Sequence, residues 1–242
     1  MTSLPARRWK AVYFDAGETL LAPHPSFDEL FSQVLAEHGH DVSPKRVRGA
    51  LESIAPTFTE VIDRMGGAPW STSKEASWRF WSNLYATALE ELAIPDPSHE
   101  LARDLYSKFT RYESYRLFPD AVPTLQAMRE AGLVVGLISN FEEWLEGMLI
   151  EMEVAHLFDI MVISGKEGME KPDPAIFRLA LDRTGVAAGD SLYVGDHPRI
   201  DVEGARAVGM GAVLIDRRGR HVSFDGIRIQ TLTELLDLME AR

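Results

Sequence analysis

Residues 11–20 read Ala-Val-Tyr-Phe-Asp-Ala-Gly-Glu-Thr-Leu, an apolar run that breaks into a polar turn at Asp15. A short apolar run that ends at turn residues is typical of a buried strand. A carboxylate directly after such a strand is held in place by the sheet, as a nucleophilic aspartate has to be. The stretch therefore predicts a first strand over residues 11–14 and a nucleophile at Asp15.

Polar residues follow three later apolar runs in the same manner. They are Ser139 and Asn140 after residues 133–138, Lys171 a short way after residues 160–163, and Asp196 after residues 192–195. In open parallel sheets, ligands bind at the carboxyl ends of the strands. The sequence therefore predicts one site that gathers a nucleophilic carboxylate, a hydroxyl, an ammonium group and a second carboxylate.

From residue 118 onward, predicted helices and strands alternate, which is typical of a parallel sheet covered by helices on both faces. The alternation includes helices expected to begin at Glu142, Pro174 and Asp201, and a last strand over residues 212–215. The strand before Asp15 has to join this sheet. We therefore expect an α/β fold with a doubly wound, Rossmann-like parallel-sheet core.

Residues 21–117 show helical periodicity in place of strand signals. Ser26 is a candidate N-cap of a first helix, and Ser43-Pro44 opens a second. A third helix is expected after Ser73 and a fourth after Pro97-Ser98. This segment predicts a helical-bundle cap inserted after the first strand. The predicted domains are residues 1–20 and 118–242 for the catalytic core and residues 21–117 for the cap, with hinges near residues 21–25 and 117–119.

The composition limits the partners that the protein can have. The 242 residues carry a formal net charge of −12 and a pI near 5.0, which disfavours nucleic acid and anionic membrane surfaces. We expect a small-molecule substrate, and a monomer or a homodimer.

Cysteine usage and hydropathy bear on where the protein works. There is no cysteine, which excludes disulfides and thiolate metal sites and fits the cytoplasm. The longest apolar run, residues 133–138, is far shorter than the roughly 20 residues of a membrane-spanning helix. Residues 1–10 lack the apolar stretch of a signal peptide. We expect a soluble, cytoplasmic protein with no membrane partner.

Four elements of the chain resemble the motifs of the haloacid dehalogenase-like (HAD) hydrolase superfamily: residues 15–19, Ser139, Lys171, and Gly195-Asp196 with Asp201. The four in this order are far more specific than any one of them. The resemblance covers the core and, less specifically, the cap. It implies a phosphatase-type hydrolase that acts on a small phosphorylated metabolite through an aspartyl-phosphate.

Magnesium is the expected cofactor. A carboxylate that attacks a phosphate needs cations to screen the two negative charges. Mg²⁺ prefers hard oxygen ligands, which Asp15 and Asp196 would supply from adjacent strand ends. The family resemblance adds the backbone carbonyl of Gly17 as a further ligand.

The other motif residues have expected roles of their own. Lys171 would lie beside the nucleophile and a phosphate oxygen, and the phosphoryl group would bind the Ser139 hydroxyl and the amides near Asn140, where a helix begins. Asp201 would support the metal shell through water or orient Lys171, and it is also a candidate N-cap of the following helix. Thr19 would hydrogen-bond within its turn.

The chain departs from the family pattern at Gly17. Phosphatases of the family commonly have a second aspartate there, which protonates the leaving alcohol and then activates water. General acid–base assistance of this kind contributes about 10²–10⁴ in rate. Three explanations stay open: Glu18 or a cap residue supplies the proton, the leaving group needs none, or the chain is a catalytically weak phosphate-binding, metal-binding or regulatory protein.

Two other activities of the superfamily are alternatives. Dehalogenases also lack this aspartate and attack carbon without a metal, but they usually have a bulky residue at the position of Gly17 and lack the Gly-Asp acid pair. Phosphonatases have a small residue there and a cap lysine that forms an imine, for which Lys45, Lys74 and Lys108 are available. The acid pair favours magnesium and phosphorus.

Two polar segments near the later strand ends have simpler interpretations. Arg217, Arg218 and Arg220, after the last predicted strand, are expected to form a solvated basic turn rather than an anion site. His197, beside Asp196, would touch the leaving group or water, or would lie exposed in a turn.

Overall fold

The structure, a computed structural model, describes residues 9–54, 58–64 and 67–240. It divides the chain into two compact units: unit 1 comprises Met1–Ala22 and Leu117–Arg242, and unit 2 comprises Pro23–Arg116. The two ends of the predicted core, residues 1–8 and 241–242, lie outside the described residues. A catalytic role for unit 1 and a cap role for unit 2 stay predictions.

Unit 1 is built on a six-stranded parallel sheet with the strand order β5-β4-β1-β6-β7-β8. The strands are β1 (Ala11–Phe14), β4 (Val134–Ser139), β5 (Ile160–Ile163), β6 (Ser191–Gly195), β7 (Gly211–Ile215) and β8 (Arg228–Ile229). Every residue of β1 is buried, because this strand lies between β4 and β6. The α/β fold expected from the alternating pattern is confirmed.

The register of the sheet determines which residues meet at its carboxyl edge. Ala11 pairs with Val134 of β4 on one side and with Ser191 of β6 on the other. Because the three strands run in the same direction, Asp15 at the end of β1 lies level with the ends of β4 and β6.

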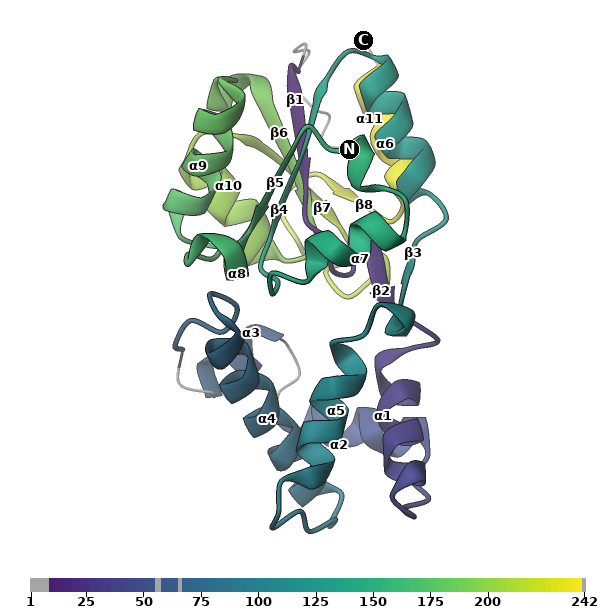
Figure 1. Cartoon of the computed structure of the whole chain (residues 1–242). Helices are drawn as coiled ribbons and strands as arrows, with labels where there is room; N and C mark the ends of the chain where they lie inside the picture. Colours follow the sequence, from purple (N-terminus) through teal and green to yellow (C-terminus); the bar gives the residue numbers. More distant parts are fainter. Residues whose placement is uncertain (1–8, 55–57, 65–66, 241–242) are drawn as a thin grey trace. The chain divides into compact units, whose positions relative to one another are not determined.

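Helices cover both faces of this sheet (Figure 1). They are α6 (Ala121–Glu130), α7 (Leu145–Glu151), α8 (Ser164–Glu167), α9 (Pro174–Thr184), α10 (Gly204–Ala207) and α11 (Leu232–Glu240), with short 3₁₀ turns at Ala155–Leu157 and Ala188–Asp190. In Figure 1, α9 and α10 lie on one face of the sheet, and α6 and α11 lie on the other. The start of α9 agrees with the sequence, since Asp173 caps it and Pro174 opens its first turn.

Two helix starts in unit 1 differ from the sequence-based expectation. α7 begins at Leu145 and not at Glu142, because the N–H and the carbonyl of Phe141 are bonded to Ser164 and Gly165 at the start of α8. The segment after β6 is a π-helix over Pro198–Glu203 that leads into α10. Asp201 therefore lies inside a helix and is not its N-cap. The sequence-based prediction also missed β8 and α11.

Unit 2 is helical, as expected for residues after the first strand. Its helices are α1 (Phe27–Glu37), α2 (Pro44–Ile54), α3 (Phe58–Arg64), α4 (Lys74–Glu91) and α5 (Glu100–Phe109), followed by a 3₁₀ turn at Tyr112–Ser114. The Ser26 and Ser73 hydroxyls accept from the N–H groups of the third residue along, which confirms Ser26 as an N-cap and makes Ser73 the N-cap of α4. Ser98 does not cap α5, because the carboxylate of Asp96 accepts the first free amides of that helix instead.

Aromatic side chains form much of the core of unit 2. The rings of Phe27 and Phe109 stack with centroids 4.3 Å apart, and Tyr85 packs against both. Two short strands, β2 (Leu21–Pro23) and β3 (Tyr115–Leu117), pair where the chain leaves unit 1 and returns to it. Across the described ranges, every helix is too short or too polar to cross a membrane.

Candidate active site

Asp15 opens a tight turn at the carboxyl edge of the sheet. Its amide donates to the Val194 carbonyl of β6, and the Ala16 carbonyl accepts from the amides of Leu20 and Leu21, which closes the turn. Glu18 has a left-handed backbone with φ 52°. Glycine adopts this conformation without strain, so the structure gives a physical reason why glycine suits this position and a glutamate there costs about 1 kcal/mol.

Lys171 is the centre of the buried charges. Its Nζ atom lies 2.7 Å from Oδ1 of Asp15, 2.7 Å from Oδ1 of Asp201 and 2.8 Å from the hydroxyl of Tyr193. The side chain is 2% exposed, so these contacts use all three of its N–H donors out of reach of bulk water. Burial lowers the pKa of Lys171, but the charges of Asp15 and Asp201 outweigh this and raise it overall. The ammonium group is therefore charged.

The Gly-Asp motif is explained by a close approach between Gly195 and Asp201. A Cβ atom at Gly195 would lie 2.4 Å from the carboxylate carbon of Asp201, so only glycine leaves room for that carboxylate. The second Asp201 oxygen accepts from the backbone N–H of His197. Both oxygens are thus engaged within the protein, and the π-helix is the backbone form that directs this side chain back to the strand end. Asp201 thus contacts Lys171 directly, and its role in orienting Lys171 stays a prediction.

Sequence reasoning missed Tyr193. Its hydroxyl donates to the Ile138 carbonyl of β4 at 2.7 Å and accepts from Lys171. Burial, together with the charges of Asp201 and Asp15, raises the pKa of Tyr193 well above its usual value, so the hydroxyl stays neutral. Strand parity could have found it, because Tyr193 and Gly195 are two residues apart on β6 and point to the same face.

Ser139 and Asn140 lie at the end of β4, but their side chains bond to protein groups in this structure. The Ser139 hydroxyl donates to Oδ1 of Asp15 at 2.9 Å. The Asn140 side-chain amide donates to the Lys171 carbonyl at 2.8 Å and accepts from the Lys171 amide at 2.7 Å. No helix opens at Asn140, since α7 starts at Leu145, so the expected helix N-terminal anion site is not formed there.

Asp196 differs from the other two acids of the cluster. Carboxylate oxygens of Asp15, Asp196 and Asp201 all lie within 4.8 Å of one another. In the part of the chain that the structure describes, the Asp196 carboxylate has no hydrogen bond or ion pair. Burial raises its pKa well above the usual value, and the nearby charges of Asp201, Asp15 and Glu18 raise it further.

This donor set fits a magnesium ion. Three carboxylates face a single ammonium group, so the cluster has an excess of negative charge when all are ionised. Oδ1 of Asp15 is taken by Ser139 and Lys171, whereas its Oδ2 and the whole Asp196 carboxylate have no hydrogen bond within the described ranges. Hard, anionic oxygens without protein partners are the ligands that Mg²⁺ prefers.

Three residues near this cluster have surroundings that the sequence did not indicate. Glu18 forms an ion pair with Arg218, with 2.9 Å between Oε1 and Nη2. The Thr19 hydroxyl is buried and has no hydrogen-bond partner among the described residues, so the expected bond within the turn is not formed. The His197 ring caps the π-helix, because its Nδ1 accepts from the Ile200 amide.

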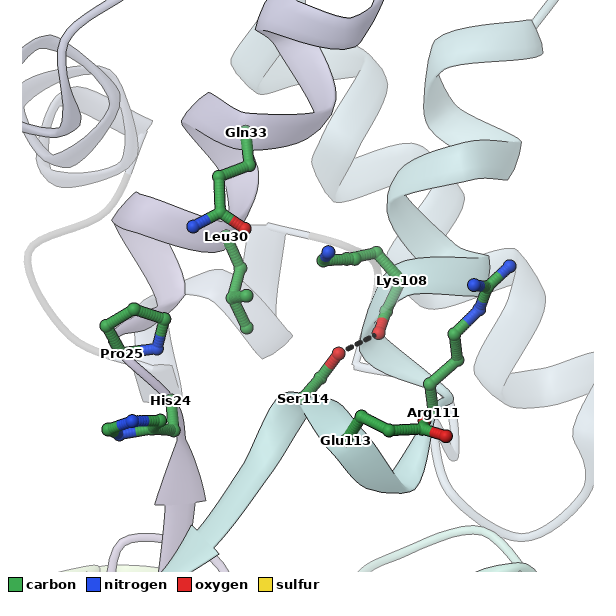
Figure 2. A pocket seen from close by; sticks show the side chains of 8 residues that line it. All are labelled: His24, Pro25, Leu30, Gln33, Lys108, Arg111, Glu113 and Ser114. Atoms are coloured by element: carbon green, nitrogen blue, oxygen red, sulfur yellow. Dashed lines mark hydrogen bonds between the residues drawn. The ribbon is translucent and has the colours of Figure 1, made fainter.

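Unit 2 contains a separate cavity of about 320 Å³ between α1 and the end of α5 (Figure 2). Its lining residues are His24, Pro25, Leu30, Gln33, Lys108, Arg111, Glu113 and Ser114. In Figure 2 the Lys108 side chain extends toward α1, whereas that of Arg111 points away from it. Lys108 thus supplies a positive charge to this cavity, but the Glu113 carboxylate also lines it and would repel an anion. We therefore assign the cavity no binding role.

Known proteins share both the sequence pattern and the fold. The family profile of haloacid dehalogenase-like hydrolases matches residues 9–209. The chain is 30% identical over 237 residues to haloacid dehalogenase-like hydrolase domain-containing protein 3 of Danio rerio, covering 97% of this chain and 96% of the relative.

A second relative matches part of the chain, and a solved structure shares its fold over nearly the whole length. Over 146 residues the chain is 38% identical to a phosphoserine phosphatase of Thermus thermophilus, covering 59% of this chain and 57% of that enzyme. The solved structure of the HAD-hydrolase YfnB of Bacillus subtilis, bound to magnesium, superimposes with a TM-score of 0.75 at 14% identity, over 96% of this chain and 99% of that one, which shows a shared fold. The family match over most of the chain shows that this protein belongs to the haloacid dehalogenase-like hydrolases.

Proposed function

We propose that this protein is a magnesium-dependent phosphatase that hydrolyses a small phosphorylated metabolite through an aspartyl-phosphate on Asp15. The observation that carries the proposal is the cluster of Asp15, Lys171 and Asp196, in which Asp196 alone lacks a hydrogen-bonding or ion-pairing partner among the described residues. The similarity to a phosphoserine phosphatase supports phosphate monoesters as the substrate class.

The residues of unit 1 suit this chemistry. An oxygen of Asp15 attacks phosphorus, the bond from phosphorus to the ester oxygen breaks, and the alcohol leaves after taking a proton. Lys171 offsets the negative charge of Asp15 during the attack, and Ser139 fixes the orientation of the Asp15 carboxylate. Water then attacks the phosphorus of the aspartyl-phosphate, which releases phosphate and restores Asp15.

Magnesium would be held by Asp15, Asp196 and the backbone carbonyl of Gly17. When bound, it would supply positive charge that screens the nucleophile from the phosphate. Asp201 would act through Lys171, because both of its oxygens already accept hydrogen bonds from protein groups. Ser139 and Lys171 would contact the phosphoryl group, and a contact from the backbone near Asn140 stays a prediction.

The absence of a second aspartate at Gly17 has a consequence for substrate choice. An alkoxide leaving group needs a proton, whereas an activated aryl oxide does not. Glu18 is the candidate donor on the nucleophile turn, and it is held by Arg218 in this structure.

The location in the cytoplasm and the choice between monomer and homodimer also stay predictions from the sequence.

The test is a panel of phosphate monoesters assayed with Mg²⁺ and with EDTA, for the wild-type protein and Asp15→Asn. We expect hydrolysis that requires Mg²⁺ and is lost in Asp15→Asn, and an acid-stable phosphoryl label on the wild-type protein after a quench. Hydrolysis that survives both treatments would exclude the proposal.

Each alternative function predicts a different result once 2-halo acids and phosphonates are assayed beside the phosphate monoesters. Metal-independent halide release from 2-halo acids would indicate a dehalogenase. Hydrolysis of a phosphonate that borohydride abolishes would indicate an imine-forming lysine. Binding of Mg²⁺ and phosphate without turnover of any ester would favour a binding or regulatory protein.

A further inference from the structure

Arg217 is a partly buried residue of unit 1 that the sequence placed in a solvated turn. It follows β7, and its side chain is 11% exposed. Its Nη2 and Nε atoms donate to the Thr19 carbonyl at 2.7 and 3.2 Å. The expected solvated basic turn is therefore wrong for Arg217, whose guanidinium group reaches the turn that starts at Asp15.

The other edge of the Arg217 guanidinium group is held by Asp120, and the group also lies over the Phe118 ring. Its two Nη atoms donate to the two carboxylate oxygens of Asp120 at 2.9 and 3.0 Å, and its Cζ atom lies 3.8 Å from the centroid of the Phe118 ring. Asp120 also accepts from the Leu232 amide at the start of α11. Burial raises the pKa of Asp120, but the bonds from Arg217 and Leu232 outweigh this and lower it, so the pair is charged on both sides.

The contact at Thr19 matters because it ties the turn to the segment after β7, whereas the Glu18 and Leu20 amides close the turn only within itself. The Thr19 hydroxyl has no hydrogen-bond partner in the described ranges, so its carbonyl is the group through which this residue is held. The same turn contains Gly17, the expected carbonyl ligand of the metal, and begins at the nucleophile. A displacement of about 1 Å at a reacting group can cost about 10² in rate.

We propose that Arg217 is a positioning residue, which fixes the turn of residues 15–19 through the Thr19 carbonyl and thereby sets the places of Asp15 and of the Gly17 carbonyl. The inference rests on the proposed function for its effect on turnover. A forked guanidinium group is required, because one edge binds a carbonyl while the other binds a carboxylate. A lysine keeps the charge but cannot bridge both.

Arg217→Lys tests the role, and Arg183→Lys is its matched control. Arg183 forms an equally forked pair with Glu167 in unit 1, at 2.6 and 2.8 Å, but does not contact the turn. We expect Arg217→Lys to lower kcat by about 10² with little change in KM, and Arg183→Lys to leave both unchanged. Asp120→Asn keeps the bond to Thr19 while it removes the partner charge, so we expect an intermediate loss of kcat.

Equilibrium binding of Mn²⁺, followed by electron paramagnetic resonance without substrate, is the second measurement. We expect Arg217→Lys to weaken Mn²⁺ binding by 10-fold or more, with the folded state verified by near-UV circular dichroism. Wild-type kcat and wild-type Mn²⁺ affinity in a folded Arg217→Lys protein would overturn the inference, as would equal losses in Arg183→Lys. If the wild-type protein hydrolyses no phosphate ester, the proposed function fails, whereas the Mn²⁺ measurement still decides the role of Arg217.

Discussion

The hydroxyl of Tyr193 accepts a 2.8 Å hydrogen bond from the ammonium group of Lys171. Since its own proton goes to the Ile138 carbonyl, the hydroxyl presents a lone pair and not a donor to the lysine. A neutral acceptor on one side and two carboxylates on the others hold Nζ in one place. Tyr193 thus helps to hold the Lys171 ammonium group in position, although none of the four sequence motifs contains Tyr193.

Tyr193→Phe removes that acceptor. We expect kcat to fall about 10-fold or more, and the free energy of unfolding to fall by about 1–3 kcal/mol, because Lys171 and the Ile138 carbonyl each lose a partner in a buried setting. Tyr13→Phe is the matched control, since the buried Tyr13 hydroxyl bonds to Thr184 and not to the charged cluster. Urea unfolding and steady-state kinetics on both variants check this. Equal loss of activity in the two would contradict a specific role.

Gly195→Ala forces a methyl group against the Asp201 carboxylate. The added Cβ would lie 2.5 Å from Oδ2, so the carboxylate has to move and take Lys171 with it. We expect a loss of about 10²–10³ in kcat, the size of effect seen when one preorganised electrostatic group is lost. Gly49→Ala, where an added Cβ meets nothing within 4 Å, should keep full activity. Full activity in Gly195→Ala would contradict the need for glycine beside the Asp201 carboxylate.

Glu18→Gln tests the missing proton donor. If Glu18 protonates the leaving group, turnover of an alkyl phosphate should drop by about 10²–10⁴ while that of 4-nitrophenyl phosphate changes little, because an aryl oxide leaves without a proton. Arg218→Gln, which removes only the partner of the ion pair, is the companion variant. The same fall on both substrates, or none on either, would remove Glu18 from the proton transfer.

Asp196 and Asp216 follow the neighbouring strands β6 and β7. When EDTA removes metal, their contributions to the free energy of unfolding should change with pH in opposite directions. Burial and neighbouring carboxylates raise the pKa of Asp196, so its stabilising contribution is present below about pH 4 and is lost as the pH rises through the raised value. For Asp216, burial raises the pKa, but the amides of His221 and Arg220 and the Arg228 side chain outweigh this and lower it. Its contribution is present above about pH 4 and is lost as the pH falls.

Asp196→Asn should therefore raise the free energy of unfolding at pH 7 in EDTA, with the gain shrinking toward pH 4. Asp216→Asn should lower it at pH 7 by about 1–3 kcal/mol, since two amides lose an ionised acceptor. Urea titrations at several pH values measure both. With Mg²⁺ present, the wild-type protein should gain stability that Asp196→Asn does not. A destabilised Asp196→Asn protein in EDTA would exclude strained, unpaired charge at this position.

The strand ends could be predicted from the sequence because each depends on local pattern. An apolar run followed by a polar residue predicts a strand and its end, and parallel pairing then brings Asp15, Ser139 and Asp196 to one edge. The order of the motifs added Lys171, whose loop follows β5. These inferences need no knowledge of side-chain contacts between distant segments.

Contacts across the fold could not be predicted in this way. Arg217 lies 198 residues from Thr19, and nothing near it in sequence indicates that its guanidinium group would be buried between a carbonyl and a carboxylate. The helix expected at Glu142 failed for a similar reason, because Phe141 exchanges hydrogen bonds with a segment more than 20 residues later. In both cases tertiary partners override the local signal.

Unit 2 occupies the chain between β1 and the two strands that flank it. A ribosome therefore completes Pro23–Arg116 before either Val134 or Ser191 exists for Ala11 to pair with. Domains generally fold as units during translation, so the inserted unit is able to fold first while the apolar β1 segment waits without neighbours. The first strand to leave the ribosome is thus exposed while the whole of the inserted unit is made, and an apolar strand without pairing partners is the kind of segment that chaperones protect.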